Sequence, residues 1–262
     1  MKKNKYFTLT IMTVVLFISG VSSLDSNHFL NQDEMEKYLK NAPILSIEKD
    51  LELGRTNFWR ITLNDGKKER RAIFKHVDRP RPHILSDSYK YELAAYKLNK
   101  MLSLNIVPPL VERTINNQEG SLQLLVENVI TERERALKKI KPKNPQEFKN
   151  DLDLINLFRI LVHDQSSDTN DILIQLDNWK VWRVDFSMAF FPSSDILPES
   201  RIERCSKSLF KNLMDIKNRH LEKELDPYLN KREINGLIER KNTIIRTIRN
   251  LIKLNGEEAV LF

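Results

Sequence analysis

Short runs of alternating apolar and polar residues dominate the first half of the chain, and this period is typical of half-buried strands. Between these runs lie turn-forming residues, including Gly54, the "NDG" of residues 64–66 and the "NNQEG" of residues 116–120. "NDG" between two such runs predicts a tight β-hairpin. The pattern predicts strands over Leu45–Leu53, Asn57–Leu63, residues 70–76, Leu110–Ile115 and Ser121–Val126.

Apolar residues at helical spacing predict two helices in this half of the chain, one before the strands and one among them. A short helix is expected around Asp33–Leu39, with Asn31 or Asp33 as its cap. A longer amphipathic helix is expected over residues 86–103, and the "VPP" of residues 107–109 ends it.

The pattern changes after residue 130, where helical spacing becomes the rule. Helices are expected over residues 147–163, 200–224 and 231–254, and the apolar face of the last one is that of a core helix. Ile172–Gln175 and Val181–Val184 form a small hairpin between them. The expected fold is α+β, with a strand-rich lobe that contains one helix, a helical lobe, and a hinge near residues 127–131. Ligand-binding pockets occur preferentially at the interface between two such lobes.

The first 23 residues follow the plan of a secretory signal peptide. A positive start with three lysines precedes the apolar run Phe7–Ile18 and the small residues Val21 to Ser23. The run is short for a bilayer, which needs about 20 residues. Secretion or export to the periplasm is therefore expected, with no stable transmembrane span after cleavage; an uncleaved membrane anchor is the alternative. The expected domains are a signal peptide (1–23), a helical extension (24–45), an N-lobe (46–130) and a C-lobe (131–262).

Composition excludes several functional classes. Six glycines leave no glycine-rich phosphate loop of the Walker type. The formal net charge of +7 falls by three when residues 1–23 are removed, and so mild a charge does not predict nucleic-acid binding. Cys205 is the only cysteine, which excludes an intramolecular disulfide and favours an inert packed thiol.

Three charged residues stand out against their apolar surroundings. Lys75 ends the apolar strand "AIFK", where a buried cation needs an anion, and Glu92 in the following helix is a natural partner. A lysine that only extends to solvent from a strand end is the alternative. Asp185 lies between the apolar runs "VWRV" and "FSMAF", and its burial is costly unless it is paired or binds a metal. A structural cap is the alternative for Asp185.

Six segments occur in an order that resembles a known family. They are "RRAIFK", "YELAAYKL", "VPPLVER", "GSLQLLVE", "FRILVHDQSSDTNDILI" and "WKVWRVDFSMAF". Together they resemble bacterial kinase-like proteins of the phosphatidylinositol 3-/4-kinase-like branch of the protein-kinase superfamily, over about residues 50–192. The resemblance implies a two-lobed kinase-like fold that binds ATP with Mg²⁺ or Mn²⁺. It places Lys75 at the phosphate-binding lysine, Glu92 at its helix partner, Asp185 at the metal-binding aspartate and Gly54 in the turn over the phosphates.

The catalytic loop departs from the family's pattern. The pattern runs approximately N-x-D-R-N-x-x-N before a short strand. Aligned on "ILI" at 172–174, it places Asp171 at the metal-binding Asn, Ser166 at the catalytic Asp, Asp164 at the first Asn and Asp168 at the second. Either Asp164 or Asp168 has taken over the orienting of the nucleophile, or the general-base position is empty. Of the two acids, Asp164 is expected to lie near the nucleophile. General-base assistance is worth about 10²–10⁴-fold in rate.

These residues predict a nucleotide-binding phosphotransferase with an unknown acceptor, which could be a protein, a lipid or a small molecule. Two alternatives stay open. A pseudokinase that acts as a binding or regulatory module is suggested by Ser166 at the catalytic position. Nucleotidyl transfer on the same fold is the other, because a fold alone does not fix the reaction.

Overall fold

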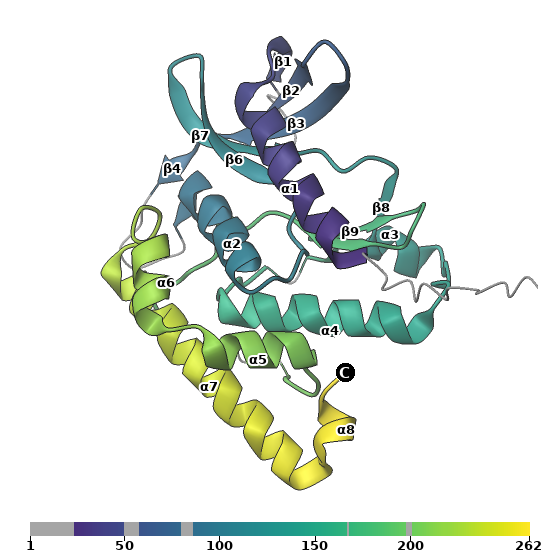
Figure 1. Cartoon of the computed structure of the whole chain (residues 1–262), viewed down its shortest axis with the longest axis vertical. Coiled ribbons are helices and arrows are strands. Elements are labelled where there is room, and N and C mark those ends of the chain that lie inside the picture. Colours follow the sequence, from purple (N-terminus) through teal and green to yellow (C-terminus); the bar gives the residue numbers. More distant parts are fainter. Residues whose placement is uncertain (1–23, 50–57, 80–85, 167, 198–200) are drawn as a thin grey trace, which may run out of the picture.

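A computed structural model of the chain describes residues 24–49, 58–79, 86–166, 168–197 and 201–262, with side chains from Gln32 onward. The expected signal peptide and the expected phosphate-covering turn at Gly54 lie outside the described residues. A sheet stands at one end of the molecule, and most of the helices gather at the other (Figure 1). This is the expected α+β fold with a strand-rich part and a helical part.

The strand-rich part is one antiparallel sheet of five strands. Its spatial order is β1-β2-β3-β7-β6. The strands are β1 (Ile44–Lys49), β2 (Phe58–Asn64), β3 (Glu69–Lys75), β6 (Leu110–Ile115) and β7 (Gln118–Leu124). The expected hairpin at "NDG" is confirmed: β2 pairs with β3, and Gly66 takes the left-handed φ of 85° that the turn requires. Lys75 lies opposite Ser121 in the neighbouring β7.

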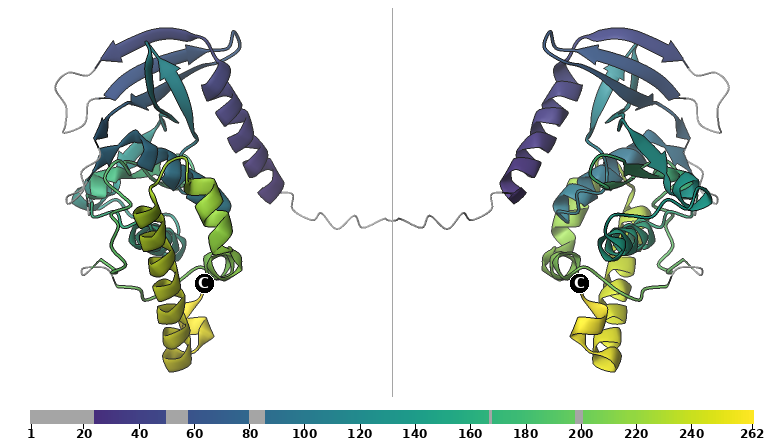
Figure 2. Two further views of the ribbon diagram at one scale, coloured as in Figure 1. Left: turned by 90° about the vertical axis from the view of Figure 1, so that its left-hand side faces the viewer. Right: turned by 90° about the vertical axis from the view of Figure 1, so that its right-hand side faces the viewer.

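Two helices pack on this sheet against β6 and β7. They are α1 (Leu24–Asn41) and α2 (Tyr89–Met101). Figure 2 shows α1 descending from the sheet along one side of the molecule. Leu39 and Ala42 close the small core of the sheet, while α2 belongs to the larger core of the helical part. The sequence predicted only a short helix near Asp33–Leu39, whereas α1 extends from Leu24 to Asn41.

The helical part is built around α4 (Pro145–Leu161) and α7 (Lys231–Asn255), which contact each other. A small sheet of β8 (Val129–Thr131), β9 (Ile172–Gln175) and β10 (Val181–Arg183) contacts α4 through β10. The remaining elements are short: β4 (Asp78–Arg79), β5 (Asp87–Ser88), α3 (Glu132–Leu137), the 3₁₀ helix η1 (Thr169–Asp171), α5 (Lys207–Asp215), α6 (Asn218–Leu225) and α8 (Glu257–Val260).

The expected single helix over residues 200–224 is wrong. Residues 201–206 are not helical, and the helical region that follows is divided into α5 and α6. Ile216 and Lys217 are extended between them, with ψ of 121° and 138°. Neither Gly nor Pro marks this break. Ile216 packs against the large core. The position of the break is therefore set by tertiary packing, which the local sequence pattern does not show.

Helix α7 supports the segment that follows Asp185. A reciprocal capping box between Asn230 and Glu233 begins the helix. Arg240, farther along α7, is fully buried and donates to the carbonyl oxygens of Leu161 (2.9 Å), Phe191 (3.2 Å) and Ser193. One helix thus fixes both the end of α4 and the segment after β10. Among the described residues, no helix has the length and apolar character needed to cross a membrane.

Candidate active site

Three charged side chains from distant parts of the sequence meet between the two lobes. Lys75 at the end of β3 places its Nζ 2.5 Å from Oε1 of Glu92 in α2 and 2.7 Å from Oδ1 of Asp185, which follows β10. The side chains of Lys75 and Glu92 are 14% and 2% exposed, and that of Asp185 is 45% exposed. The predicted pairing of Lys75 with Glu92 is therefore present. Asp185 presents the open side of the cluster.

Close packing of the backbone fixes the position of Lys75. Gly120 in β7 lies beside the end of β3, and a Cβ built there would be 2.4 Å from the carbonyl oxygen of Lys75 and 2.6 Å from the ring of Phe74. Real side chains do not approach that closely, so glycine at this position lets β7 lie against the lysine.

The charged groups of the cluster shift one another's pKa values. Burial lowers the pKa of Lys75, but attraction to Glu92 and Asp185 outweighs burial and raises it, so the amine stays protonated. Attraction to Lys75 lowers the pKa of Asp185 to about 2, and hydrogen bonds from Lys75 and Ser187 contribute. Burial raises the pKa of Glu92 despite the neighbouring lysine. At neutral pH the cluster therefore contains an ionised carboxylate at its open side.

The backbone at Asp185 is strained in a way that directs this carboxylate. Asp185 has a φ of 63°, which costs a non-glycine residue free energy and occurs often at functional sites. The hydroxyl of Ser187 donates to Oδ1 of Asp185 over 3.1 Å, and the amide of Ser88 donates to the carbonyl of Ser187 over 2.9 Å. The turn after Asp185 is thus fastened to β5 and the start of α2.

The loop of residues 163–171 is organised by one buried arginine. Arg183 in β10 places Nη2 2.6 Å from Oδ2 of Asp164 and Nη1 3.0 Å from Oδ2 of Asp171. The other oxygen of Asp164 accepts the amide of Ser166 over 2.9 Å, and the Ser166 hydroxyl donates to Asp171 over 3.0 Å. Asp164 is only 1% exposed. Both of its oxygens are engaged in holding the loop.

Asp168 occupies a different position in the same loop. It is exposed, and its Oδ1 accepts the amide of Asn170, which caps η1. This hydrogen bond is the largest cause that lowers the pKa of Asp168. Asp168 therefore keeps an ionised carboxylate at the surface of the loop, while Asp164 is enclosed beneath it. Which of the two orients a nucleophile stays a prediction.

Comparison with solved structures identifies the type of fold. Neither the models of known protein families nor the sequences of curated proteins match this chain. The crystal structure of a Helicobacter pylori proinflammatory kinase, CtkA, superposes with a TM-score of 0.53 at 10% sequence identity, covering 84% of this chain and 98% of that one. This chain has a kinase-like fold. A structure of the open conformation of CtTel1 is less similar, with a TM-score of 0.42 at 12% identity, covering 80% of this chain and 12% of that one.

At this level of identity the likeness shows the kinase-like fold alone. The closer branch expected from the sequence, that of the phosphatidylinositol 3-/4-kinase-like proteins, stays a prediction. Lys75 from the sheet, Glu92 from α2 and Asp185 from the segment after β10 meet where the sheet and the helical part adjoin. The predicted residues Lys75, Glu92 and Asp185 form one cluster, and Asp164, Ser166 and Asp171 form a second around Arg183.

The donor set suits a small hard cation that is shared with phosphate. No group of three or more His, Cys, Asp or Glu side chains gathers as a metal cage within the described ranges. Mg²⁺ in phosphoryl-transfer sites needs only one or two protein carboxylates, because phosphate oxygens and water supply the rest. Asp185 and Asp171, one ionised and the other partly exposed, fit that requirement.

Arg183, Ser187 and Asp87 belong to this region, and the sequence interpretation did not select them. Arg183 could have been selected from the sequence, because a cation inside the apolar run "VWRV" must pair with a buried anion. Ser187 could not. Asp87 in β5 is partly buried, and burial raises its pKa, with the charge of Asp185 adding to the effect. Its approach to Asp185 depends on the β4–β5 pairing, which the pattern did not predict.

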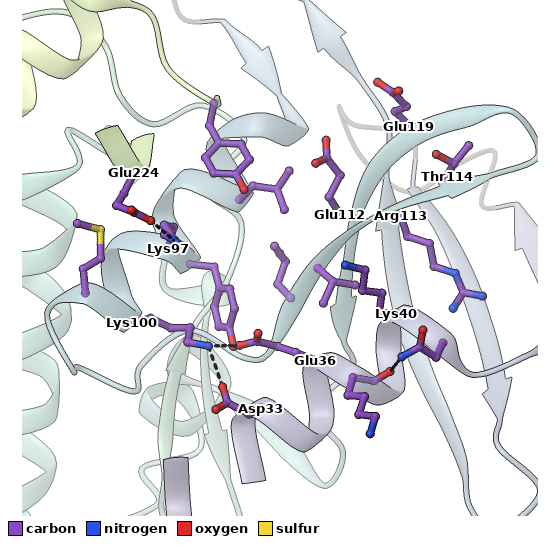
Figure 3. A pocket seen from close by; sticks show the side chains of 18 of the residues that line it. Asp33, Glu36, Lys40, Lys97, Lys100, Glu112, Arg113, Thr114, Glu119 and Glu224 are labelled. Carbon is purple, nitrogen blue, oxygen red and sulfur yellow. Dashed lines mark hydrogen bonds and ion pairs between the residues drawn. The ribbon is translucent and has the colours of Figure 1, made fainter. Parts of the chain in front are cut away.

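A separate cavity of about 1070 Å³ lies on another side of α2, between α1, β6 and α6 (Figure 3). Lys100 reaches Asp33 and Glu36 of α1 at 3.0 and 2.6 Å, and Lys97 reaches Glu224 of α6 at 2.6 Å. None of the residues in the Lys75 or Arg183 clusters lines it. The candidate active site is therefore chosen on its buried charge clusters and not on the size of a cavity.

Proposed function

We propose that this chain is a phosphotransferase that uses ATP with Mg²⁺ or Mn²⁺ and transfers the terminal phosphoryl group to an acceptor yet to be identified. The observation that carries the proposal is the cluster of Lys75, Glu92 and Asp185 at the interface of a kinase-like fold. Phosphoryl transfer depends mainly on positioning and on charge stabilisation. A protonated lysine beside an ionised aspartate in a partly buried site meets both needs.

Each residue has a distinct part in this proposal. Lys75, held by Glu92, donates to the phosphate oxygens of the nucleotide. Asp185 and Asp171 hold the metal ion, which would neutralise charge between the phosphates. Lys75 pairs with Asp185 and Arg183 pairs with Asp171, so a cation holds each carboxylate in place before the ligand binds.

Ser166 bears on how the acceptor is activated. Its hydroxyl donates to Asp171 and cannot act as a base at neutral pH. Asp168 is the exposed carboxylate of the loop, and Asp164 is committed to Arg183. We therefore assign Asp168 the orienting of the acceptor, with catalysis weaker than in an enzyme that has an aspartate at position 166. An exported location is part of the proposal, and cell fractionation of the expressed protein tests it.

A pseudokinase is the second candidate, and Ser166 is the observation that favours it. Such a protein would bind nucleotide, or a protein partner, without transferring phosphate. Nucleotidyl transfer is distinguished by mass, because an acceptor gains AMP in that reaction and phosphate in a kinase reaction.

Thermal unfolding of the protein with ATP and either metal ion tests nucleotide binding. Ligand at 100 times its dissociation constant stabilises a protein by about 2.7 kcal/mol, which is a shift of several degrees at this size. We expect a metal-dependent shift that Asp185→Ala abolishes and that Asp215→Ala, an exposed aspartate of α5, leaves unchanged. No shift with either metal ion at millimolar ATP would refute the proposal.

Transfer is then followed with radiolabelled ATP. Label from the γ position should enter an acceptor, or the protein itself, and Asp185→Ala should abolish its entry. Binding without transfer, in the presence of candidate acceptors, supports the pseudokinase. Label that enters from the α position instead identifies nucleotidyl transfer.

A further inference from the structure

The last residue of α3 and the loop that follows it combine an exposed leucine with strong positive charge. We name residues 137–143, "LKKIKPK", the basic loop; it has four lysines and no acidic residue. Leu137 is 75% exposed, and the four lysines are exposed as well. An exposed leucine alone needs no explanation, but one surrounded by lysines on a projecting loop is a recurrent feature of membrane-surface contacts.

Most of this charge is free of intramolecular partners. Lys138 pairs with Glu134 at 2.5 Å, with both side chains largely exposed. No ion pair reaches Lys139, Lys141 or Lys143 from any residue that the structure describes. Lys139 has a left-handed φ of 54°, which turns the chain sharply and separates the loop from α3. The loop therefore projects several cations that the fold itself does not use.

The chemistry of the loop selects among anionic partners. Nucleic-acid surfaces usually add aromatic side chains on which bases stack, and residues 132–147 contain none. An acidic peptide would be held by the lysines and would make no use of Leu137. A lipid surface uses both, because anionic headgroups attract the lysines while the leucine enters the interface.

We propose that the basic loop docks the protein on the anionic surface of a lipid bilayer, through Leu137 and the four lysines. The proposal is independent of the phosphotransferase activity. It has a geometric consequence for that activity: α3 contacts η1, and Thr131 donates to Asn170 over 3.4 Å, so the docking loop and the catalytic loop share one support. Docking would place the loop of residues 163–171 close to the lipid surface.

Cosedimentation of the whole chain with vesicles tests this proposal. The vesicles are phosphatidylcholine alone, or phosphatidylcholine mixed with phosphatidylglycerol. We expect stronger binding to the anionic vesicles, weakened by added salt. Each lysine near such a surface is worth about fivefold in binding, so replacing Lys138, Lys139, Lys141 and Lys143 by Gln should lower binding to anionic vesicles at least about tenfold.

Two matched variants control for charge and for apolar exposure. Replacing Lys207, Lys211, Lys217 and Lys223 by Gln removes the same charge from exposed positions on and around α5 and α6, and should keep nearly full binding. Leu137→Ser should lower binding several-fold, whereas Leu254→Ser, at a leucine 79% exposed in α7, should not. Because every variant keeps residues 1–23, any contribution from that segment cancels in the comparison.

Three outcomes would overturn the proposal. They are equal binding of the unchanged protein to both kinds of vesicle, equal losses in the two four-lysine variants, and loop-dependent binding of poly-glutamate or duplex DNA without a preference for anionic vesicles. The last outcome would identify an acidic protein or a nucleic acid as the partner. Circular dichroism of each variant confirms that the substitutions at exposed positions leave the fold intact.

Discussion

Lys75 and Glu92 depend on each other for stability, because both side chains are nearly enclosed. Removing one member of a buried ion pair leaves the other without compensation, at a cost of about 3–5 kcal/mol. We therefore expect Lys75→Met to lower the free energy of unfolding by about 3 kcal/mol. Adding Glu92→Gln to it should restore part of that loss. Urea denaturation of the two single variants and the double variant measures this coupling, and additive losses would contradict it.

Asp185 should make stability depend on pH at the acid end. Its pKa of about 2 in the folded chain is below the value of about 3.9 in an unfolded one. A lowered pKa contributes stability that is present above about pH 4 and is lost as the pH falls toward 2. Asp185→Asn should therefore be less stable than the unchanged protein at pH 7. The difference should shrink below pH 4 in thermal melts; a constant difference would show that the ion pair has no such role.

Arg183 should be as important to the loop as any of its acids. Arg183→Gln leaves Asp164 buried without its cation, and we expect a loss of about 3 kcal/mol together with weaker metal-dependent nucleotide binding. Arg183→Lys should recover little, because a lysine cannot bridge two carboxylates as the guanidinium does. Arg71→Gln removes an exposed pair with Glu127 and should change stability by less than about 1 kcal/mol. Equal effects at both arginines would refute this role.

At the scale of elements, glycine is required at two positions for different reasons, backbone conformation at one and lack of space at the other. Gly66 needs its left-handed φ, but an added Cβ would meet nothing within 4 Å. Gly120 has room for no side chain, because the carbonyl oxygen of Lys75 lies in the way. We expect Gly66→Ala to cost about 1 kcal/mol and Gly120→Ala about 3 kcal/mol. Only Gly120→Ala should also weaken nucleotide binding, since it moves Lys75; denaturation and nucleotide titration of both variants check this.

The pattern along the sequence predicted elements well where local chemistry decides them. The strand Leu110–Ile115 has the predicted bounds, and the "NDG" hairpin forms as predicted. The pattern gave a wrong prediction where contacts between distant residues determine the structure, as at the break between α5 and α6. The candidate site divides in the same way: Lys75, Glu92 and Asp185 could be selected as charges in apolar runs. The ion pair of Arg183 with Asp164 needs a contact across 19 residues that no period encodes.

At the scale of the whole molecule, the sheet and the helical part have separate cores of unequal size. Among the described residues, the sheet core has nine buried members, whereas the larger core takes α2 together with α4 and α7. A smaller core gives lower local stability, and hydrogen exchange reports such differences. We expect amides of β1–β3 to exchange faster than those of α4 and α7. ATP with metal should slow exchange in β3 most, because Lys75 at the end of that strand would bind the phosphates; uniform slowing would contradict this.

The cavity behind α2 offers a way to act on the site without entering it. Its wall includes Leu93 and Lys97, which lie on the same helix as Glu92 but are turned away from it by about 100° and about 140° around the helix axis. A compound bound in this cavity would contact that helix without occupying the proposed nucleotide site. Since the wall is assembled from α1 and α6 as well, its shape is particular to this arrangement of helices. An inhibitor of this kind could therefore distinguish this protein from other proteins with a kinase-like fold.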